Sequence, residues 1–245
     1  MQSAWEAALG DEIAGLHPRI RAYVRAIPPG SVGRGQGVFT EAGSRSAVMR
    51  PVLAVMARWG IVFPERGRQV AFSIENRADA HGAVHARRTL RFARRERVMV
   101  DRVREHRGLV VDALGTGGRL EAALRVSAHD GALMARSGAV RVRIAGVWWS
   151  IPAAVRPRVD LVERWDDEAQ QQHVNVRVSM PVLGDIYGYH GWFDYAVVAE
   201  STVEPPERGD RSADSERLGE WQYQRNRPGG ASSWPRHRGL SARHS

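Results

Sequence analysis

Apolar side chains recur at helical spacing over the first part of the chain. Ser3 followed by Glu6 is the signature of a capping box, in which two backbone donors are satisfied reciprocally at a helix start. The apolar positions, each three or four residues from a neighbour, are Trp5, Leu9, Ile13, Leu16, Ile20, Tyr23, Val24 and Ile27. Pro18 interrupts this stripe and Pro28 ends it. The pattern predicts two short amphipathic helices here, and a third over Ser46 to Trp59.

From Ile61 the pattern changes to alternation, with turn residues about every eight to twelve positions, which is typical of consecutive antiparallel strands. The alternating positions that we assign to strand faces are Val70, Phe72 and Ile74; Val84, Ala86, Leu90 and Phe92; Val98 and Val100; Leu109, Val111 and Ala113; Leu120, Ala122, Leu124 and Val126; Met134 and Arg136; Val140, Val142 and Ile144; Val159, Leu161 and Trp165; Val174, Val176, Val178 and Met180; and Phe193, Tyr195 and Val197. Asp130-Gly131 accepts the positive φ angles of a tight hairpin turn. The glycine-rich stretch Gly30 to Gly37 is expected to be a connector.

About eight to ten strands preceded by helices predict an α+β fold that is mainly β. We expect two or three N-terminal helices on an antiparallel β-barrel or half-barrel, in a domain that spans residues 1–200. After Glu200 the chain is rich in Ser, Pro, Gly, Arg and Glu and poor in aliphatic residues, so it buries too little apolar surface to offset its ordering entropy. Residues 201–245 are therefore expected to form a disordered, arginine-rich tail.

The composition excludes several kinds of site. With no cysteine, the chain has no disulfide, no thiolate metal ligand and no cysteine nucleophile. This fits a reducing compartment, and we expect a cytoplasmic location. The first residues lack a basic segment leading into an apolar one, and Ser150 and Pro152 interrupt the most apolar stretch, Ala145 to Val155. Neither a secretion signal nor a transmembrane helix is predicted.

The formal net charge of +9 raises the question of nucleic-acid binding, yet all 36 basic residues are arginine. A complete absence of lysine fits a coding bias, which raises the charge without selection for phosphate binding. Arginines concentrate between Arg77 and Arg107, in predicted strands where charges usually form a solvated face. Because no helix-turn-helix, zinc-finger or RNA-recognition signature accompanies them, we do not expect nucleic-acid binding. The five arginines of residues 221–245 could contact an anionic partner, but an idle extension is the simpler interpretation.

Several short phrases together resemble one bacterial family. In order, they are Ala8-Leu9-Gly10 with Leu16-His17-Pro18; Phe63-Pro64 with Gly67, Val70, Phe72 and Ile74-Glu75-Asn76; Arg88-Thr89-Leu90-Arg91-Phe92; Asp112 with Leu114-Gly115; Arg136-Ser137-Gly138; Glu163 with Trp165-Asp166-Asp167-Glu168; and Pro181 with Leu183-Gly184, Gly188-Tyr189, Gly191 and Phe193. Their order and spacing resemble the domain-of-unknown-function family 4166. The family has no established activity, so the resemblance implies domain boundaries rather than a mechanism. The chain departs from the family at Leu90, where an aromatic residue is usual.

Two local motifs have structural interpretations that we favour over functional ones. Leu109 to Gly118 looks like a strand entering a dinucleotide-binding loop, but Leu120 stands where that fingerprint requires Gly or Ala, and a hairpin turn is expected. His81 and His85 flank a predicted turn with only Asp79 near as a third ligand, so exposed loop histidines are expected. We predict no metal and no cofactor.

Arg88 is the most informative single residue, because alternation places it on the same strand face as Ala86 and Leu90. A guanidinium keeps its charge, so its burial requires a carboxylate or an anionic ligand. Glu163 lies on an apolar face by the same logic, and Glu75 and Asp112 are further candidate partners. The alternatives are a structural ion pair, a ligand-contacting pair inside a cavity, or a side chain that bends to the rim.

Two aromatic segments complete the candidate chemistry. Leu183 to Asp194 places four aromatic residues among glycines, and it could line a barrel mouth, where Tyr189 and Phe193 would contact a ligand, or plug one end of the core. Trp148-Trp149 with Ile151-Pro152 could form a lid, a core edge or a membrane-touching patch.

The function that we favour from the sequence is non-catalytic binding of a small hydrophobic or carboxylate-bearing ligand in a barrel cavity, held by Arg88 and covered by the first helices. One alternative is an enzyme in which Glu163 or Asp112 serves as general base while Arg88 stabilises an enolate or carboxylate. The other is an accessory domain that meets a partner protein. The favoured interpretation includes no catalytic residue and leaves the oligomeric state open.

Overall fold

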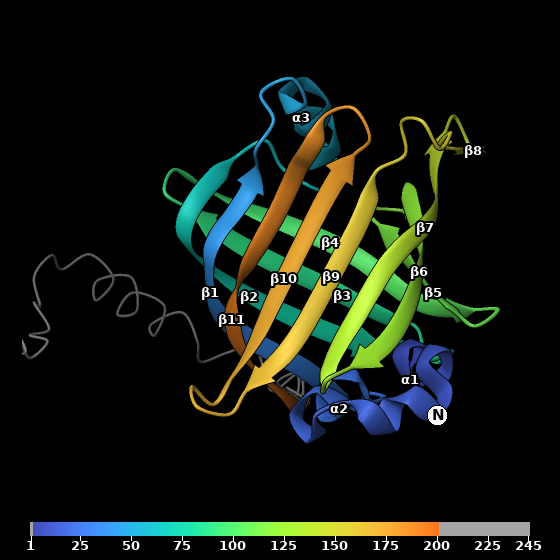
Figure 1. Ribbon diagram of the computed structural model, residues 1–245, viewed down its shortest axis with the longest axis vertical. Coiled ribbons are helices and arrows are strands. Elements are labelled where there is room, and N and C mark those ends of the chain that lie inside the picture. The colour runs from blue at the N-terminus through green and yellow to red at the C-terminus, as the bar shows by residue number, and fades with distance from the viewer. Residues whose placement is uncertain (1, 201–245) are drawn as a thin grey trace, which may run out of the picture. The chain divides into compact units, whose positions relative to one another are not determined.

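One antiparallel sheet closes into a barrel in the computed structural model, which describes residues 2–200 (Figure 1). Its strands are β1 Ser31–Ser44, β2 Arg66–Ala78, β3 Val84–Phe92, β4 Arg95–His106, β5 Leu109–Leu114, β6 Leu120–His129, β7 Ala132–Ile144, β8 Val147–Ser150, β9 Arg158–Asp166, β10 Gln171–Met180 and β11 Gly184–Ala199. Strands β1 to β7 pair in sequence order, β7 then pairs with β9, and β11 returns to β1. Ten strands therefore close the barrel, while β8 pairs only with β7. The predicted mainly β fold is confirmed; the predicted tail at 201–245 lies outside the described residues.

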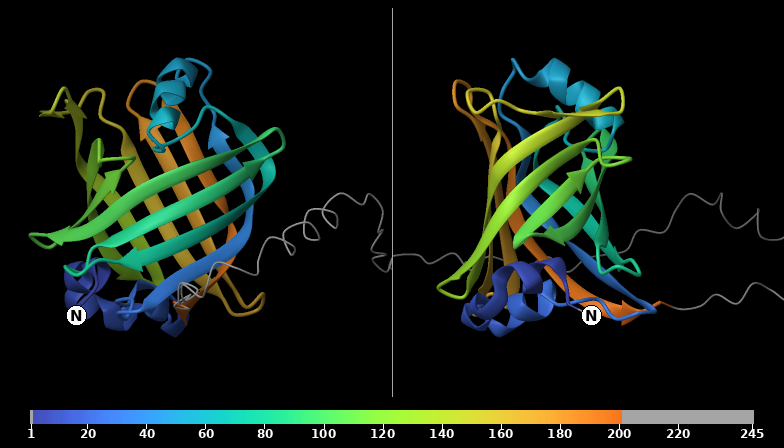
Figure 2. Two further views of the ribbon diagram at one scale, coloured as in Figure 1. Left: turned by 180° about the vertical axis from the view of Figure 1, so that it is seen from behind. Right: turned by 90° about the vertical axis from the view of Figure 1, so that its right-hand side faces the viewer.

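Short helices lie at the two ends of the barrel (Figures 1 and 2). At one end, called here the α1–α2 end, are α1 Ala4–Leu9, the 3-10 helix η1 Gly10–Gly15 and α2 Pro18–Val24. At the other, called the α3 end, is α3 Arg50–Arg58, which starts later than predicted, with a proline in its first turn, where a missing N–H costs nothing. Within residues 2–200 no helix is long and apolar enough to cross a membrane.

The predicted capping box is present at the start of α1. The Ser3 hydroxyl accepts a hydrogen bond from the Glu6 backbone N–H at 3.0 Å, and the Glu6 carboxylate accepts one from the Ser3 N–H at 2.8 Å. The Ser3 hydroxyl also donates to the Val24 carbonyl at 2.5 Å. Ser3 therefore joins the start of α1 to the end of α2, which holds the two helices together across the barrel end.

Alternation predicted the inward face correctly on most strands, but not on three of them. The structure buries Met99, Asp101 and Val103 of β4, whereas Val98 and Val100 were expected inside. The register of β5 with its neighbours turns Val110 and Asp112 inward, not Val111 and Ala113. On β7 the buried residues are Leu133 and Ala135, while Arg136 points outward to Asp160. Valine favours strands on either face, so valine alone does not set the inward phase.

The stretch Gly30 to Gly37 is not a connector, because most of it belongs to β1. Gly35 and Gly37 pair with Tyr195 and Phe193 of β11. A Cβ atom at Gly33 would collide with the Tyr195 ring, and one at Gly37 would collide with the backbone of Trp192 and Phe193. Glycine in this strand is therefore required by close approach of β11 rather than by a turn.

The Asp130-Gly131 hairpin turn is confirmed. Both residues have positive φ, at 48° and 78°, between β6 and β7. Gly115 to Gly118 likewise forms the turn between β5 and β6, as expected, and no helix follows it.

The buried apolar residues form three clusters inside the barrel and under its helices. The largest includes Phe39, Phe72, Leu90, Met99 and Phe193. A second joins Ala4 of α1 to strands β4 to β7, and a third packs η1 and α2 on Leu133. The clusters leave room between them for a group of polar side chains that also face inward.

Candidate functional site

Arg88 lies inside the barrel, on β3 between the buried residues Ala86 and Leu90. Its Nη1 donates to Oδ2 of Asp101 on the neighbouring strand β4, forming an ion pair. Burial lowers the pKa of Arg88, but Asp101 and the weaker contributions of Tyr189, Tyr23 and Asp112 together raise it by more, so the guanidinium stays charged. Asp101 is 1% exposed, whereas the Arg88 side chain is 21% exposed although it faces the interior. Within residues 2–200 no other polar group bonds to the guanidinium.

Asp112 on β5 is the second carboxyl group beside this pair. Burial raises its pKa well above the ordinary range, the charge of Asp101 raises it further, and Arg88 lowers it. A carboxyl group whose pKa is raised in this way keeps its proton to a higher pH than an ordinary aspartic acid. One oxygen of each carboxyl, Oδ1 of Asp101 and Oδ1 of Asp112, is buried without a hydrogen-bond partner in the described part of the chain.

Glu163 and Gln172 form the third polar contact in the interior. Glu163 on β9 accepts a hydrogen bond from Gln172 Nε2 on β10 at 2.7 Å, and both residues are buried. Burial raises the pKa of Glu163 to about 7, although the Gln172 hydrogen bond and Arg88 both lower it. Glu163 therefore changes charge near neutral pH.

Three tyrosines and one asparagine complete the polar group. The Asn76 amide on β2 donates to the Tyr195 hydroxyl at 3.2 Å, and its Oδ1 is buried without a partner. Tyr23 of α2 packs edge-on against Phe193 and Tyr195, with ring centroids 5.7 and 4.8 Å away. Burial raises the pKa of Tyr23, and burial also raises that of Tyr189 to about 12. We call these residues, listed in chain order, the interior polar cluster: Tyr23, Asn76, Arg88, Asp101, Asp112, Glu163, Gln172, Tyr189 and Tyr195.

The space beside the cluster is accessible and is bounded by aromatic rings. Arg88, Asp112 and Tyr189 face inward by strand register, yet each is only half-buried, so water-sized space remains next to them. Phe39 and Phe72 stack at 3.8 Å between ring centroids, and the ring of Tyr189 lies 4.7 Å from that of Phe39. Partly accessible side chains of Arg88, Asp112 and Tyr189 thus face the interior, close to the buried rings of Phe39 and Phe72.

Five of the six residues selected from the sequence face the interior, and the sixth does not. Arg88, Asp112, Glu163, Tyr189 and Phe193 are inside the barrel. The sixth, Glu75, is corrected: it lies on the outer face, where its carboxylate pairs with Arg34 at 3.5 Å and Arg77 at 2.9 Å.

The true partner of Arg88 was not predicted from the sequence. That partner is Asp101, which the wrong phase for β4 had placed outside; alternation counted from Met99 would have found it. Asn76, Gln172, Tyr195 and Tyr23 were missed as site residues as well. The first three share a strand face with apolar residues, which is the signal that could have identified them.

The structure also shows where the aromatic block and the pair His81 and His85 lie. The aromatic block belongs to β11, whose Tyr187, Tyr189 and Phe193 line the interior, so it forms neither a rim loop nor a separate plug. His85 lies 3.3 Å from Asp79, which also accepts from Arg102. Among residues 2–200 no three His, Asp or Glu side chains are grouped as metal ligands would be.

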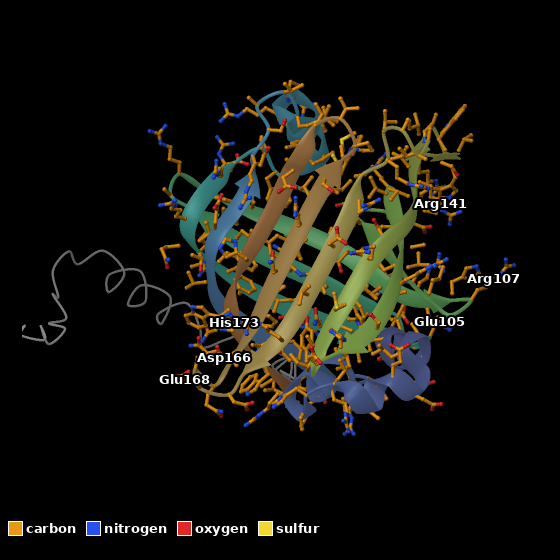
Figure 3. All side chains as sticks on the ribbon, in the orientation of Figure 1. Glu105, Arg107, Arg141, Asp166, Glu168 and His173 are labelled. Atoms are coloured by element: carbon orange, nitrogen blue, oxygen red, sulfur yellow. The ribbon has the colours of Figure 1, made fainter. Side chains whose placement is uncertain are left out.

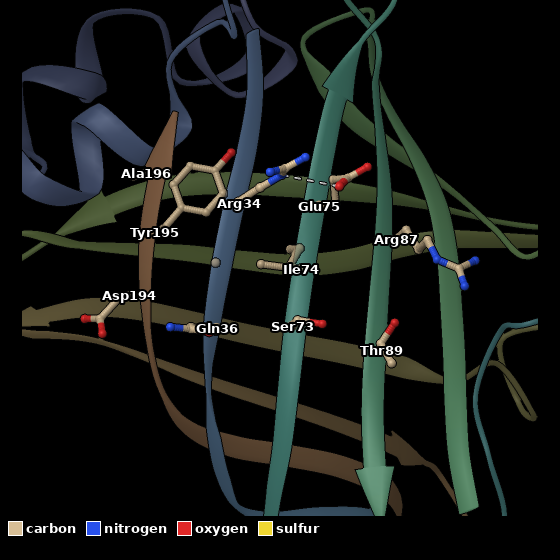
Figure 4. Close-up of a pocket in the computed structure, with 11 residues that line it drawn as sticks. Arg34, Gln36, Ser73, Ile74, Glu75, Arg87, Thr89, Asp194, Tyr195 and Ala196 are labelled. Carbon is tan, nitrogen blue, oxygen red and sulfur yellow. Dashed lines mark ion pairs between the residues drawn. The ribbon is translucent and has the colours of Figure 1, made fainter. Parts of the chain in front are cut away.

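A polar groove also crosses the outer face of β11, β1, β2 and β3 (Figure 4). It encloses about 580 Å³ and is lined by Arg34, Gln36, Ser73, Glu75 and Thr89, among others. Its opposite charges face each other, as in the Arg34–Glu75 pair of Figure 4. The groove therefore has no concentrated charge and no buried polar group left unpaired.

Comparison with known proteins places the barrel in a family. The model of the family described as Domain of unknown function (DUF4166) matches residues 16–193, which is more than half of the chain. The chain belongs to this family. The DUF4166 match runs from Leu16, directly after η1, into β11 and includes every residue of the interior polar cluster except Tyr195. The chain is also similar to Uncharacterized protein YndH of Bacillus subtilis (strain 168), with 25% identity over 187 residues that cover 73% of this chain and 90% of YndH.

Proposed function

We propose that this DUF4166 barrel binds a small molecule in its interior, with an anionic group of the ligand against Arg88 and its apolar part against the Phe39–Phe72 wall. The observation that carries the proposal is that the Arg88 side chain remains partly accessible although it is paired with Asp101. Asp101 engages Nη1, while a fifth of the Arg88 side chain remains accessible inside the barrel. The other donors of a guanidinium suit a carboxylate or phosphate oxygen.

The neighbouring atoms support the same proposal. Buried polar atoms nearly always have hydrogen-bond partners, yet Oδ1 of Asn76, Asp101 and Asp112 has none within residues 2–200. These oxygens are inaccessible in the structure, so a ligand donor would reach them only with a small movement of the neighbouring side chains. A ligand with one anionic group and one or more hydroxyl groups fits this combination of donor and acceptors better than a purely apolar one. Absence of cysteine is compatible with a cytoplasmic site for this binding, which forms part of the proposal.

Native mass spectrometry of the full chain after gentle purification tests the proposal. We expect an additional mass of a small molecule that is lost on denaturation. The double variant Arg88→Met with Asp101→Asn removes both charges of the buried pair and should lose this mass while remaining folded by circular dichroism. The control, Arg87→Met, changes an exposed arginine of the same strand that points outward, and should keep it. Retention of the mass by the folded double variant would contradict the proposal.

Catalysis is a second candidate function, favoured by one observation. Glu163 faces the same interior as Arg88 and Tyr189, and its pKa is about 7. A carboxylate with a pKa in this range accepts and returns a proton efficiently near neutral pH. The test is to return the molecule released from the barrel to the protein and to follow its mass over time. Conversion by the unmodified protein but not by Glu163→Gln supports an enzyme, and an unchanged mass supports binding alone.

A further inference from the structure

The majority of the large apolar side chains that are exposed lie at one end of the barrel. Because neighbouring strands run in opposite directions, the connections β1–β2, β3–β4, β5–β6, β7–β9 and β10–β11 all lie at the α3 end (Figures 1 and 2). Of the eleven large apolar residues exposed in the described chain, nine belong to three of these segments or, for Ile144, to the strand end beside one: Val48, Val52 and Val55; Ile144, Val147, Trp149 and Val155; and Val182 and Leu183. Trp149 is 59% exposed and Val182 86%. The α3 end thus has an apolar surface contributed by three separate segments.

The β7–β8 hairpin at this end has two chemically different faces. In its register Ile144 pairs with Val147 and Val142 with Trp149, so these four apolar residues share one face. On the other face Arg143 pairs with Trp148, and the Arg141 guanidinium lies 4.5 Å from the centre of the Trp148 ring. An amphipathic hairpin with exposed tryptophan on one side and arginine on the other suits an interface between water and an apolar phase.

The formal charges are also divided between the two ends. The connections at the α3 end contain a single acidic residue, Glu65, whose carboxylate lies 2.6 Å from the Arg97 guanidinium. The same connections contain six arginines: Arg45, Arg50, Arg58, Arg94, Arg119 and Arg156. Residues 2–30 and the connections at the α1–α2 end contain four arginines, Arg19, Arg21, Arg25 and Arg107, and seven acidic residues, Glu6, Asp11, Glu12, Asp79, Asp130, Asp167 and Glu168. Glu168 and Arg141 are labelled toward opposite ends in Figure 3. The barrel therefore carries a positive α3 end and a negative α1–α2 end.

We propose that the α3 end docks on the surface of a bilayer containing anionic phospholipids, with Trp149 and its apolar neighbours entering the headgroup region and the surrounding arginines contacting lipid phosphates. Exposed apolar residues alone would also suit a partner protein or a second copy. The charge division decides for the bilayer, because a protein partner needs no uniformly cationic rim, whereas an anionic leaflet attracts arginine and orients the molecule by its charge asymmetry. The proposal stands independently of ligand binding inside the barrel.

Vesicle flotation with the full chain tests the role of the arginines. Vesicles of equal parts phosphatidylglycerol and phosphatidylcholine should bind the protein, vesicles of phosphatidylcholine alone should not, and salt should weaken the binding. Each arginine near an anionic leaflet is worth roughly fivefold in binding, so Arg50→Glu with Arg143→Glu should weaken binding at least about 25-fold. Arg25→Glu with Arg107→Glu makes the same change in net charge at the α1–α2 end and should have little effect. Equal losses of binding in the two double variants would overturn the proposal. Vesicle binding that neither double variant weakens would also overturn it.

A second pair of variants tests the apolar contact. Trp149→Ser with Val52→Ser should weaken binding to the anionic vesicles by an order of magnitude or more, given the apolar area removed. Val197→Ser with Val198→Ser, which changes the two exposed valines near the end of β11, should leave it within about twofold. The arginines of residues 201–245 are the same in all four variants, so they do not contribute to the differences. If the unmodified chain ignores the anionic vesicles and instead forms a dimer that Trp149→Ser disrupts, a second copy covers this end and the bilayer proposal is wrong.

Discussion

Arg88 on β3 and Asp101 on β4 form an ion pair inside a closed barrel, where the Asp101 side chain is 1% exposed and the Arg88 side chain 21% exposed. This asymmetry matters because a buried carboxylate without a partner is costly, so Asp101 needs Arg88. The guanidinium of Arg88 has further N–H donors, which can also bind an anionic group of a ligand. The ion pair and the proposed ligand site are therefore compatible: Asp101 anchors one nitrogen and leaves the others for the interior space.

The first prediction concerns the stability of this pair. Arg88→Met alone leaves Asp101 buried without its counter-charge and should lower the free energy of unfolding by about 3–5 kcal/mol at pH 7. Adding Asp101→Asn removes the isolated charge and should recover most of that loss. Urea denaturation of the single and double variants measures both values, and a double variant no more stable than the single one would show that Asp101 is not the partner that matters.

The second prediction concerns Glu163 and pH. Its pKa is about 7 in the folded chain and near 4.5 in the unfolded chain, so the folded state binds more protons between these values. Stability from this group is full below about pH 4.5 and declines as pH rises toward 7. Glu163→Gln should therefore be more stable than the unmodified chain at pH 8, by up to about 3 kcal/mol, with a smaller advantage at pH 5. Denaturation curves of both proteins from pH 5 to 8 give this difference, and an equal difference at every pH would count against the burial of a titrating carboxyl here.

The third prediction tests the glycines of β1. Gly37→Ala places a Cβ against the backbone of Trp192 and Phe193, where no flexible side chain can move aside, and should destabilise the fold by more than about 2 kcal/mol. Gly138→Ala in β7 is the matched control, because its nearest neighbour would lie 3.8 Å away and its φ is not positive. Thermal denaturation should show a lower Tm for Gly37→Ala only; similar Tm values would contradict the close β1–β11 approach.

The fourth prediction concerns the helices that cover the α1–α2 end. Ser3→Ala removes the N-cap of α1 and the hydrogen bond to the Val24 carbonyl, which should cost about 1–2 kcal/mol. Ser150→Ala, at an exposed position of β8, should cost much less. Chemical denaturation distinguishes the two, and a Ser3→Ala variant as stable as Ser150→Ala would mean that this contact does not hold the helices.

Much of the fold was predictable because it depends on local pattern. The Ser3–Glu6 capping box, the Asp130-Gly131 turn and the alternation of β2, β6, β9 and β10 all read directly as structure. β1 was not predictable in this way, because its glycines are explained only by close contact with a strand about 160 residues later, through the Tyr195 ring and the backbone at Phe193. Tertiary contact overrides local propensity at this strand.

The site was predictable in part for a related reason. Arg88 was identified because a charge among apolar residues on one strand face is conspicuous, and Glu163 by the same signal. Asp101 was missed because valines at 98, 100 and 103 fit either phase, and only the partner strand settles which face is inside. Closure of the barrel, which joins β11 to β1, is what brings the tyrosines of β11 toward Arg88.

Titration of the full chain with the anionic fluorophore 1-anilinonaphthalene-8-sulfonate, after removal of any bound molecule, tests interior binding most directly. We expect one saturable site per chain, weakened at least tenfold by Arg88→Met with Asp101→Asn and unchanged by Arg87→Met. Equal affinity in the folded double variant and the Arg87→Met control would contradict the claim that Arg88 holds an anionic ligand inside the barrel.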